Sequence, residues 1–166
     1  EKDYYIRPDN TKLLRTVYGT NPFPESKVIG DYIKARTTEE DHIAVFGSEP
    51  QIYFYTDRRC PSIHAYTSYL VNSTPGHAER QKEFIDDIEK SMPKYLVFFN
   101  PPVSWLVSPG AEQGIFSWFN TFSQKNYKLV GVADMLSATN TNYLWDNQVI
   151  GYKPQGQYYI YTFERK

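Results

Sequence analysis

Residues 41–62 read DHIAVFGSEPQIYFYTDRRCPS, and this stretch decides the expected fold. Its first part, His42 to Phe46, is an apolar run of strand length, and Gly47 interrupts it where the chain must turn. Ser48 is a suitable N-cap, and Gln51 three residues later completes a capping-box pattern, so a short aromatic helix is predicted directly afterwards. A buried strand that leads into a capped helix is typical of α/β folds, which bind ligands beside the carboxyl ends of their strands.

Two candidate binding groups accompany this strand and helix. Arg58 and Arg59 follow the helix, and we expect them near the same crevice, where guanidinium groups suit phosphate or carboxylate recognition. A solvated turn is the plainer alternative. Glu49 is a candidate contact as well, and its carboxylate argues against a nucleotide phosphate at the start of the helix.

The composition excludes some functional classes. The formal net charge of -1 lacks the broad basic field that nucleic-acid binding needs, so no nucleic-acid partner is predicted. The longest apolar run, residues 95–99, is far shorter than the ~20 residues that span a bilayer, which favours a soluble chain. Because the sequence begins at Glu1 without a methionine, we expect it to be a processed or excised piece of a larger protein.

Few residues suggest reaction chemistry. Cys60 is the only cysteine, so the sequence predicts neither an internal disulfide nor a thiolate zinc cluster. His42, His64 and His77 lack the short spacings of helical metal pairs, and no metal or cofactor is predicted. Ser48 stands between a strand and a helix, as a hydrolase nucleophile does, but the second glycine of that motif is missing.

The periodicity along the chain predicts an α/β fold. We expect residues 1–23 to form a juxtamembrane-like tether and residues 24–166 a single soluble α/β domain. The expected helices begin near Pro24, at Ala78 and at Ala111, and the expected strands cover residues 42–46, 63–71, 95–99 and 127–132. A closing hairpin is expected from residues 149–153 and 158–163. This order favours a three-layer sandwich with a mostly parallel sheet and an antiparallel C-terminal edge.

Residues 137–148 are expected to form a polar loop. Residues 137–147 of it combine amides, hydroxyls, a carboxylate and aromatic rings, which are the groups that hold sugars. Trp145 and Asp146 are therefore candidate substrate contacts. A merely polar connection is the plainer alternative.

Several stretches, in order, resemble the C-terminal extracytoplasmic domain of bacterial GT-C type membrane glycosyltransferases of the dolichyl-phosphate-mannose protein mannosyltransferase-like family. The resemblance covers most of the chain and is carried by the following pieces: Tyr18-Gly19, Asn21-Pro22-Phe23-Pro24-Glu25-Ser26, Val45-Phe46-Gly47-Ser48-Glu49-Pro50-Gln51-Ile52-Tyr53, Arg58-Arg59, Pro93-Lys94-Tyr95-Leu96-Val97 and Tyr127-Lys128-Leu129-Val130-Gly131-Val132-Ala133-Asp134.

The resemblance implies an enzyme that moves a sugar from a polyprenyl phosphate to an acceptor outside the cytoplasm. In that family the acidic catalytic residues belong to the membrane-embedded half, so it gives this chain no catalytic residue. It implies a periplasmic domain of an inner-membrane protein, with that membrane-embedded half and a glycan or lipid-linked sugar as partners.

The sequence therefore predicts a non-catalytic domain that assists acceptor binding or shapes the site of a polyprenyl-phosphate-sugar-dependent glycosyltransferase. Glu49, Arg58, Arg59, Trp145 and Asp146 are its candidate substrate contacts. The first alternative is a free-standing doubly wound domain that binds a small ligand beside residues 47–53. A second is a hydrolase that uses Ser48.

Overall fold

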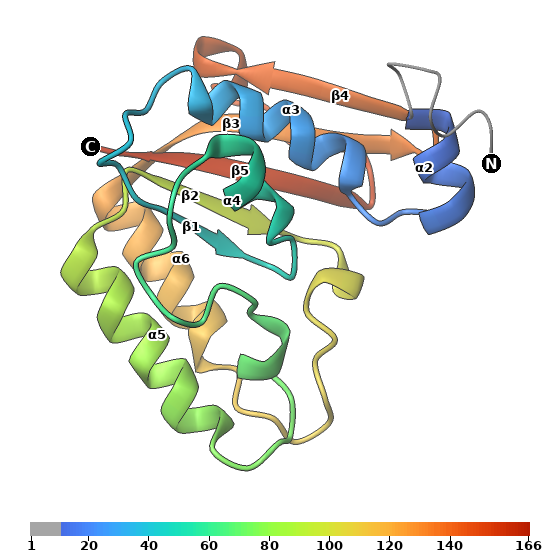
Figure 1. Cartoon of the computed structure of the whole chain (residues 1–166). Coiled ribbons are helices and arrows are strands. Elements are labelled where there is room, and N and C mark those ends of the chain that lie inside the picture. Colours follow the sequence, from blue (N-terminus) through green and yellow to red (C-terminus); the bar gives the residue numbers. More distant parts are fainter. Residues whose placement is uncertain (1–10) are drawn as a thin grey trace.

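The computed structural model describes residues 11–166, and Figure 1 shows a central sheet accompanied by helices. The helices are α2 (Thr11–Tyr18), α3 (Phe23–Lys34), α4 (Gln51–Thr56), α5 (His77–Ser91) and α6 (Gly114–Asn126). The strands are β1 (Ile43–Phe46), β2 (Tyr95–Phe99), β3 (Tyr127–Ser137), β4 (Asn140–Trp145) and β5 (Tyr158–Arg165). The expected mixed α/β class is confirmed.

The sheet is mixed, with strand order β1-β2-β5-β3-β4. Within residues 11–166 the strands β1 and β2 pair in parallel, and the pairs β2–β5, β5–β3 and β3–β4 are antiparallel. The prediction of a mostly parallel sheet was therefore wrong, as was the placing of the last strand at an edge. β5 lies between β2 and β3, where Ile160 joins the cluster of Val97 and Ala133 on one face and Phe163 packs against the cluster on the other face.

Side chains of β1 and β2 alternate between two hydrophobic clusters, as the period of a strand requires. Val45 and Val97 pack with α3 and α4, whereas Ala44 and Leu96 pack with α5 and α6. Both strands are thus covered by helices on their two faces, which explains why their sequences are almost continuously apolar. β3 and β4 lie beyond this doubly covered part, and β4 is half-exposed.

Residues 11–18, part of the segment expected to be a tether, form α2. Arg15 and Glu25 are both buried, and the Arg15 guanidinium donates a hydrogen bond to Oε1 of Glu25, which ties α2 to α3. Thr141 Oγ1 donates a second hydrogen bond to the same oxygen and adds β4 to this contact. Residues 1–10 of the expected tether lie outside the described part of the chain.

Three local predictions were wrong. Residues 63–71 form a loop with the 3₁₀ helix η1 (Ser68–Leu70) instead of a strand, and residues 149–153 do not pair with β5. Residues 140–145, expected within a polar loop, form β4, because the short turn after β3 returns the chain along it as a hairpin.

The predicted cap at Ser48 is also absent. Helix α4 begins two residues later than expected from that cap, with Pro50 as its N-cap and no side-chain hydrogen bond. Gln51 Nε2 instead donates to Ser26 Oγ (3.1 Å), which joins α4 to α3. None of the helices in residues 11–166 is both long and apolar enough to cross a membrane.

Candidate functional site

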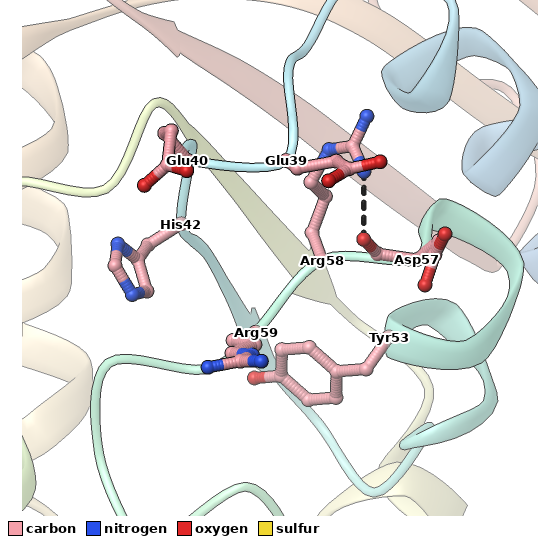
Figure 2. Close-up of a pocket in the computed structure, with 7 residues that line it drawn as sticks. All are labelled: Glu39, Glu40, His42, Tyr53, Asp57, Arg58 and Arg59. Carbon is pink, nitrogen blue, oxygen red and sulfur yellow. Dashed lines mark hydrogen bonds between the residues drawn. The ribbon is translucent and has the colours of Figure 1, made fainter.

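The main candidate site is a pocket of about 460 Å³ at the amino end of β1 (Figure 2). Three segments line it: the connection between α3 and β1, helix α4, and the residues directly after α4. Its lining residues are Glu39, Glu40, His42, Tyr53, Asp57, Arg58 and Arg59. The pocket therefore contains both of the arginines that the sequence suggested.

The short helix α4 brings Arg58 and Arg59 to this end of β1. Asp57 adopts a left-handed backbone conformation (φ 57°) that ends the helix, and Arg59 then pairs with His42 in a parallel bridge. The amide of Ile43 donates to the carbonyl of Arg59 (3.2 Å). The prediction that the basic pair lies by the carboxyl end of the strand was wrong, because α4 and its C-terminal turn carry the chain back along β1.

Arg58 is held by the protein itself. Its side chain is buried, and its Nε and one terminal nitrogen donate to Oγ1 and the carbonyl of Thr37 (2.9 and 2.8 Å). The other terminal nitrogen donates to the carbonyl of Asp57 at 2.7 Å, as Figure 2 shows. A guanidinium group bound on all three nitrogens fixes the connection before β1 and has little capacity left for a ligand.

Arg59 supplies the available positive charge of the pocket. Its side chain is exposed, and among residues 11–166 no hydrogen bond or ion pair of its guanidinium group is found. Tyr53 also lines the pocket, while its hydroxyl accepts a hydrogen bond from the Val45 amide (3.0 Å). Burial of that hydroxyl raises the pKa of Tyr53 well above its usual value, so Tyr53 stays neutral.

The carboxylates decide which ligand chemistry suits this pocket. Glu39, Glu40 and Asp57 outnumber the arginines, so a phosphate or another compact anion is repelled as well as attracted. Carboxylates accept hydrogen bonds from hydroxyl groups, and Arg59 can donate to hydroxyl or ring oxygens. The arrangement therefore favours a neutral ligand with many hydroxyl groups over the phosphate that the arginines alone suggested.

Trp145 and Asp146 lie at the same end of the sheet, beside the C-terminal turn of α3. The ring of Trp145 stacks on that of Tyr32 with centroids 4.0 Å apart, and the Tyr32 hydroxyl donates to Oδ1 of Asp146 (2.7 Å). Arg36 lies over the other face of the Tyr32 ring and within 3.6 Å of Oδ2 of Asp146. These contacts give both candidate residues a packing role. The face of the Trp145 ring that stacks on Tyr32 is not available for stacking on a sugar.

Glu49 lies apart from the other four candidates, beyond the carboxyl end of β1. Its side chain is 2% exposed, and Oε1 accepts a hydrogen bond from Ser104 Oγ, whereas Oε2 has no partner in the described structure. Burial raises the pKa of Glu49 to about 7 despite the lowering effect of that hydrogen bond. Glu49 does not line the pocket at the amino end of β1, and it is a buried titratable group held by Ser104.

Of the other residues considered from sequence, His64 has structural partners at both ring nitrogens. Nδ1 of His64 lies 2.5 Å from the Tyr69 hydroxyl, and Nε2 lies 2.9 Å from Oε2 of Glu83. Burial raises the pKa of the Cys60 thiol, which reduces its reactivity. The hydroxyl of Ser48 is buried, and no histidine is found bonded to it among residues 11–166. No group of three potential metal-binding side chains gathers in the same part of the chain.

The structure thus places Arg58 and Arg59 in the pocket at the amino end of β1, Trp145 and Asp146 at the same end of the sheet but outside that pocket, and Glu49 at the opposite end. Asp57 was expected beside the two arginines, whereas sequence reasoning missed Glu39, Glu40 and His42 as pocket residues. The only signal for them was a polar, acidic turn before a buried strand, which is common in exposed connections. Ser104, the partner of Glu49, had no sequence signal. Comparison of the chain with protein-family models, curated proteins and solved structures finds no match.

Proposed function

We propose that this chain is the extracytoplasmic, periplasmic-side C-terminal domain of an inner-membrane glycosyltransferase that uses a polyprenyl-phosphate sugar. In this proposal the membrane-embedded half of the same polypeptide performs the transfer, and the domain assists acceptor binding. The resemblance of the ordered sequence pieces supports it, and two of these pieces contact each other through Gln51 and Ser26. The proposal includes a three-layer arrangement of the domain, with helices outside both faces of β1 and β2.

The pocket at the amino end of β1 carries the proposal. It combines Glu39, Glu40 and Asp57 with the available guanidinium group of Arg59, which is a set of groups suited to the hydroxyls of a glycan. Because carboxylates repel phosphate, the pocket suits a sugar acceptor better than the polyprenyl-phosphate donor. Of the five contacts predicted from sequence, Arg59 is the one whose side chain is exposed in this pocket and has no partner in residues 11–166.

The proposal is tested by kinetics of the full-length enzyme in its membrane. We expect Arg59→Ala and Glu40→Gln each to raise KM for the acceptor by about tenfold, the effect of losing one charge-assisted hydrogen bond. The value of kcat and the KM for the lipid-linked donor should stay unchanged. Lys90→Ala, which removes an exposed charge from α5, is the matched control.

Two results would contradict this function. One is an unchanged acceptor KM in both pocket variants, which would remove the pocket from acceptor binding. The other is a native protein of 19.4 kDa, the mass of this chain alone, that is found outside the membrane fraction. This result would show that the domain is not part of a membrane enzyme.

The alternative is a free-standing domain that binds a small ligand beside residues 47–53, of which Tyr53 lines the pocket. It loses its doubly wound sheet, since one strand pair of the described sheet is parallel and the others are antiparallel. Thermal-shift measurements with nucleotides, flavins and neutral sugars separate the two proposals. A shift of several degrees with a nucleotide or flavin, lost in Arg59→Ala, would favour the small-ligand domain.

A further inference from the structure

One end of the sheet is formed by segments without charged residues. Residues 16–24, 99–111, 135–145 and 154–163 contain no Asp, Glu, Lys or Arg. They include the connection from α2 to α3, the segment after β2, the β3–β4 turn and the start of β5. We call the surface made by the connecting parts of these four segments the uncharged end.

Backbone contacts join three of these segments at one edge. The amide of Asn100 donates to the carbonyl of Tyr159 (3.1 Å), and Met135 pairs with Tyr158 in the sheet. A small cavity of about 200 Å³ is lined by Thr20 together with residues of the β3–β4 turn and the start of β5. In Figure 1 these parts lie on the side where the arrowheads of β1, β2 and β3 point and where α2 lies.

Large apolar side chains project from this end into solvent. Leu106 is 61% exposed, Leu136 is 41% exposed, and Val17 is 58% exposed. Tyr18, Val103 and Val107 are also exposed there. Several charged groups next to these segments are withdrawn from the surface, because Arg15, Glu25 and Glu49 are buried, whereas Lys153 before the fourth segment is exposed. The first exposed charge after the second segment is that of Glu112.

The opposite end of the sheet is rich in charged side chains. The connection from α3 to β1 carries Glu39, Glu40 and Asp41, and Lys94 contacts Asp41 at 3.2 Å. Lys128 and Glu164 form an ion pair of 2.7 Å where β3 begins and β5 ends. β5 has eight residues, so the two ends are separated by on the order of 25 Å. Charge is therefore segregated along the strand direction.

We infer that the uncharged end lies against a lipid surface. Single exposed apolar residues are ordinary, but here they occur on separate segments that share one edge and lack exposed charge. Such a set of loop tips suits a flat, apolar boundary, into which aliphatic and tyrosine side chains can enter without desolvating a charge. Because the four segments themselves contain no basic residue, the contact that they make is hydrophobic and does not require anionic lipid.

This inference rests on the proposed function for one point, the attachment of the domain to a membrane. A few aliphatic side chains give only weak membrane affinity on their own, so contact requires a tether that holds the domain nearby. In that setting the uncharged end orients the domain and directs the pocket at the amino end of β1 away from the bilayer.

The test measures which end of a tethered domain contacts lipid. Starting from Cys60→Ala, an environment-sensitive fluorophore is attached at Leu106→Cys, Leu136→Cys or, as the matched control, Ile150→Cys. Ile150 is 78% exposed and follows the 3₁₀ helix η3 (Asp146–Val149) at the charged end. Each labelled chain is anchored to phosphatidylcholine vesicles through a long Gly/Ser linker, either at its N-terminus or at its C-terminus. Quenching by brominated lipid is then recorded.

We expect labels at positions 106 and 136 to be quenched at least about twofold more than the label at position 150, with either anchor. Preference under both anchors excludes simple proximity of the anchored end. Stronger quenching at position 106 only when the N-terminus is anchored, or equal quenching at all three positions, would overturn the inference. A fluorescence change that grows with protein concentration in the absence of vesicles would also overturn it, because a second copy would then cover this end.

A charge-insertion variant provides a further check that does not depend on labelling position 106. Leu106→Glu should reduce quenching of the label at position 136, because a carboxylate resists entry into lipid, and far-ultraviolet circular dichroism should confirm that the variant is folded. Failure of the proposed function is distinguishable. Unaltered acceptor KM in the pocket variants concerns glycosyl transfer, whereas the vesicle experiment reports lipid contact without any enzymatic readout.

Discussion

Ser104 donates a hydrogen bond to Oε1 of Glu49, although the two residues are 55 positions apart. The bond closes the carboxyl end of β1 against the segment that follows β2. It leaves Oε2 of Glu49 buried without a partner beside Gly47, where a β-carbon would lie 2.3 Å from that oxygen. The site therefore accommodates a neutral carboxyl group more easily than a carboxylate.

The stability of the domain should fall as the pH rises between about 4.5 and about 7. Glu49 in the unfolded chain loses its proton near pH 4.5, whereas burial raises the pKa in the folded domain to about 7. The folded state then binds more protons in this window, and the free energy of unfolding decreases with pH by up to about 3 kcal/mol.

Glu49→Gln should remove most of this slope and be the more stable form at pH 8. Urea unfolding across the window measures it, with the exposed Glu79→Gln as control. If the free energy of unfolding of Glu49→Gln fell with pH as steeply as that of the wild type, Glu49 would not be the group responsible.

Ser104→Ala should destabilise the domain more at pH 8 than at pH 5. The lost hydrogen bond favoured the charged form of Glu49, so its removal raises the pKa further and leaves the carboxylate without that donor. We expect a loss of about 2 kcal/mol at the higher pH. Combining Ser104→Ala with Glu49→Gln should cancel the difference between the two pH values. An equal loss at both pH values in the single variant would mean that the carboxylate is not involved.

Substitution of Arg58 should lower the free energy of unfolding, whereas substitution of Arg59 should leave it almost unchanged. Arg58→Ala removes the hydrogen bonds to Thr37 and to the carbonyl of Asp57 from a buried position, which should cost about 2 to 3 kcal/mol. Arg59→Ala changes an exposed side chain and should stay within about 0.5 kcal/mol of wild type. Chemical denaturation of both variants gives the comparison. Equal losses would contradict the separate roles that the pocket geometry assigns to them.

Asp134→Ala should release the segment before β5. The buried carboxylate accepts hydrogen bonds from the amides of Gln155 (2.8 Å) and Gly156 (2.9 Å) and from the Tyr152 hydroxyl (2.6 Å). We expect a loss of about 3 kcal/mol and faster hydrogen exchange at those two amides. Asp31→Ala, which breaks an exposed pair with Lys27, should cost under about 1 kcal/mol. Unchanged exchange at Gln155 would show that another contact holds the segment.

Trp145→Ala should behave as a core substitution. The Trp145 ring stacks on Tyr32 and covers Gly131, where a β-carbon would meet it at 2.3 Å. We expect a loss of roughly 3 kcal/mol in the free energy of unfolding, within the range for truncating a packed aromatic ring. A stable Trp145→Ala variant with weakened acceptor binding would instead restore the sugar contact that the sequence suggested.

The sequence predicted best the elements whose periodicity is long and unambiguous. The helix over His77–Ser91 was confirmed, because its apolar spacing over several turns matches only a helix. The strand over Tyr95–Phe99 was confirmed, because an apolar run this short between Pro93 and Pro101 favours a strand over a helix. The strand order could not be predicted in the same way. Whether β5 pairs at an edge or between β2 and β3 depends on contacts between residues far apart in the sequence, and apolar alternation is the same in both cases.

The candidate site was predicted only where local chemistry and local structure coincide. Arg59 could be recognised because an exposed basic residue in a turn suits a ligand, but the commitment of Arg58 to Thr37 depends on a contact 21 residues away. Trp145 was misjudged as a loop residue because the turn at residues 137–140 carries no glycine or proline to indicate a hairpin. Ser104, the partner of Glu49, could not be predicted either, because no local sequence pattern indicates this contact.

The central position of β5 affects how the domain is made. Synthesis proceeds from the N-terminus, so β2 and β3 are present before residues 158–165, which join them. Until those residues leave the ribosome, both strands present unpaired edges and the sheet exists only as the β1–β2 and β3–β4 pairs. The whole sheet can therefore close only after residues 158–165 have left the ribosome, and nascent chains stalled before residue 158 should depend on chaperones to avoid edge-to-edge aggregation.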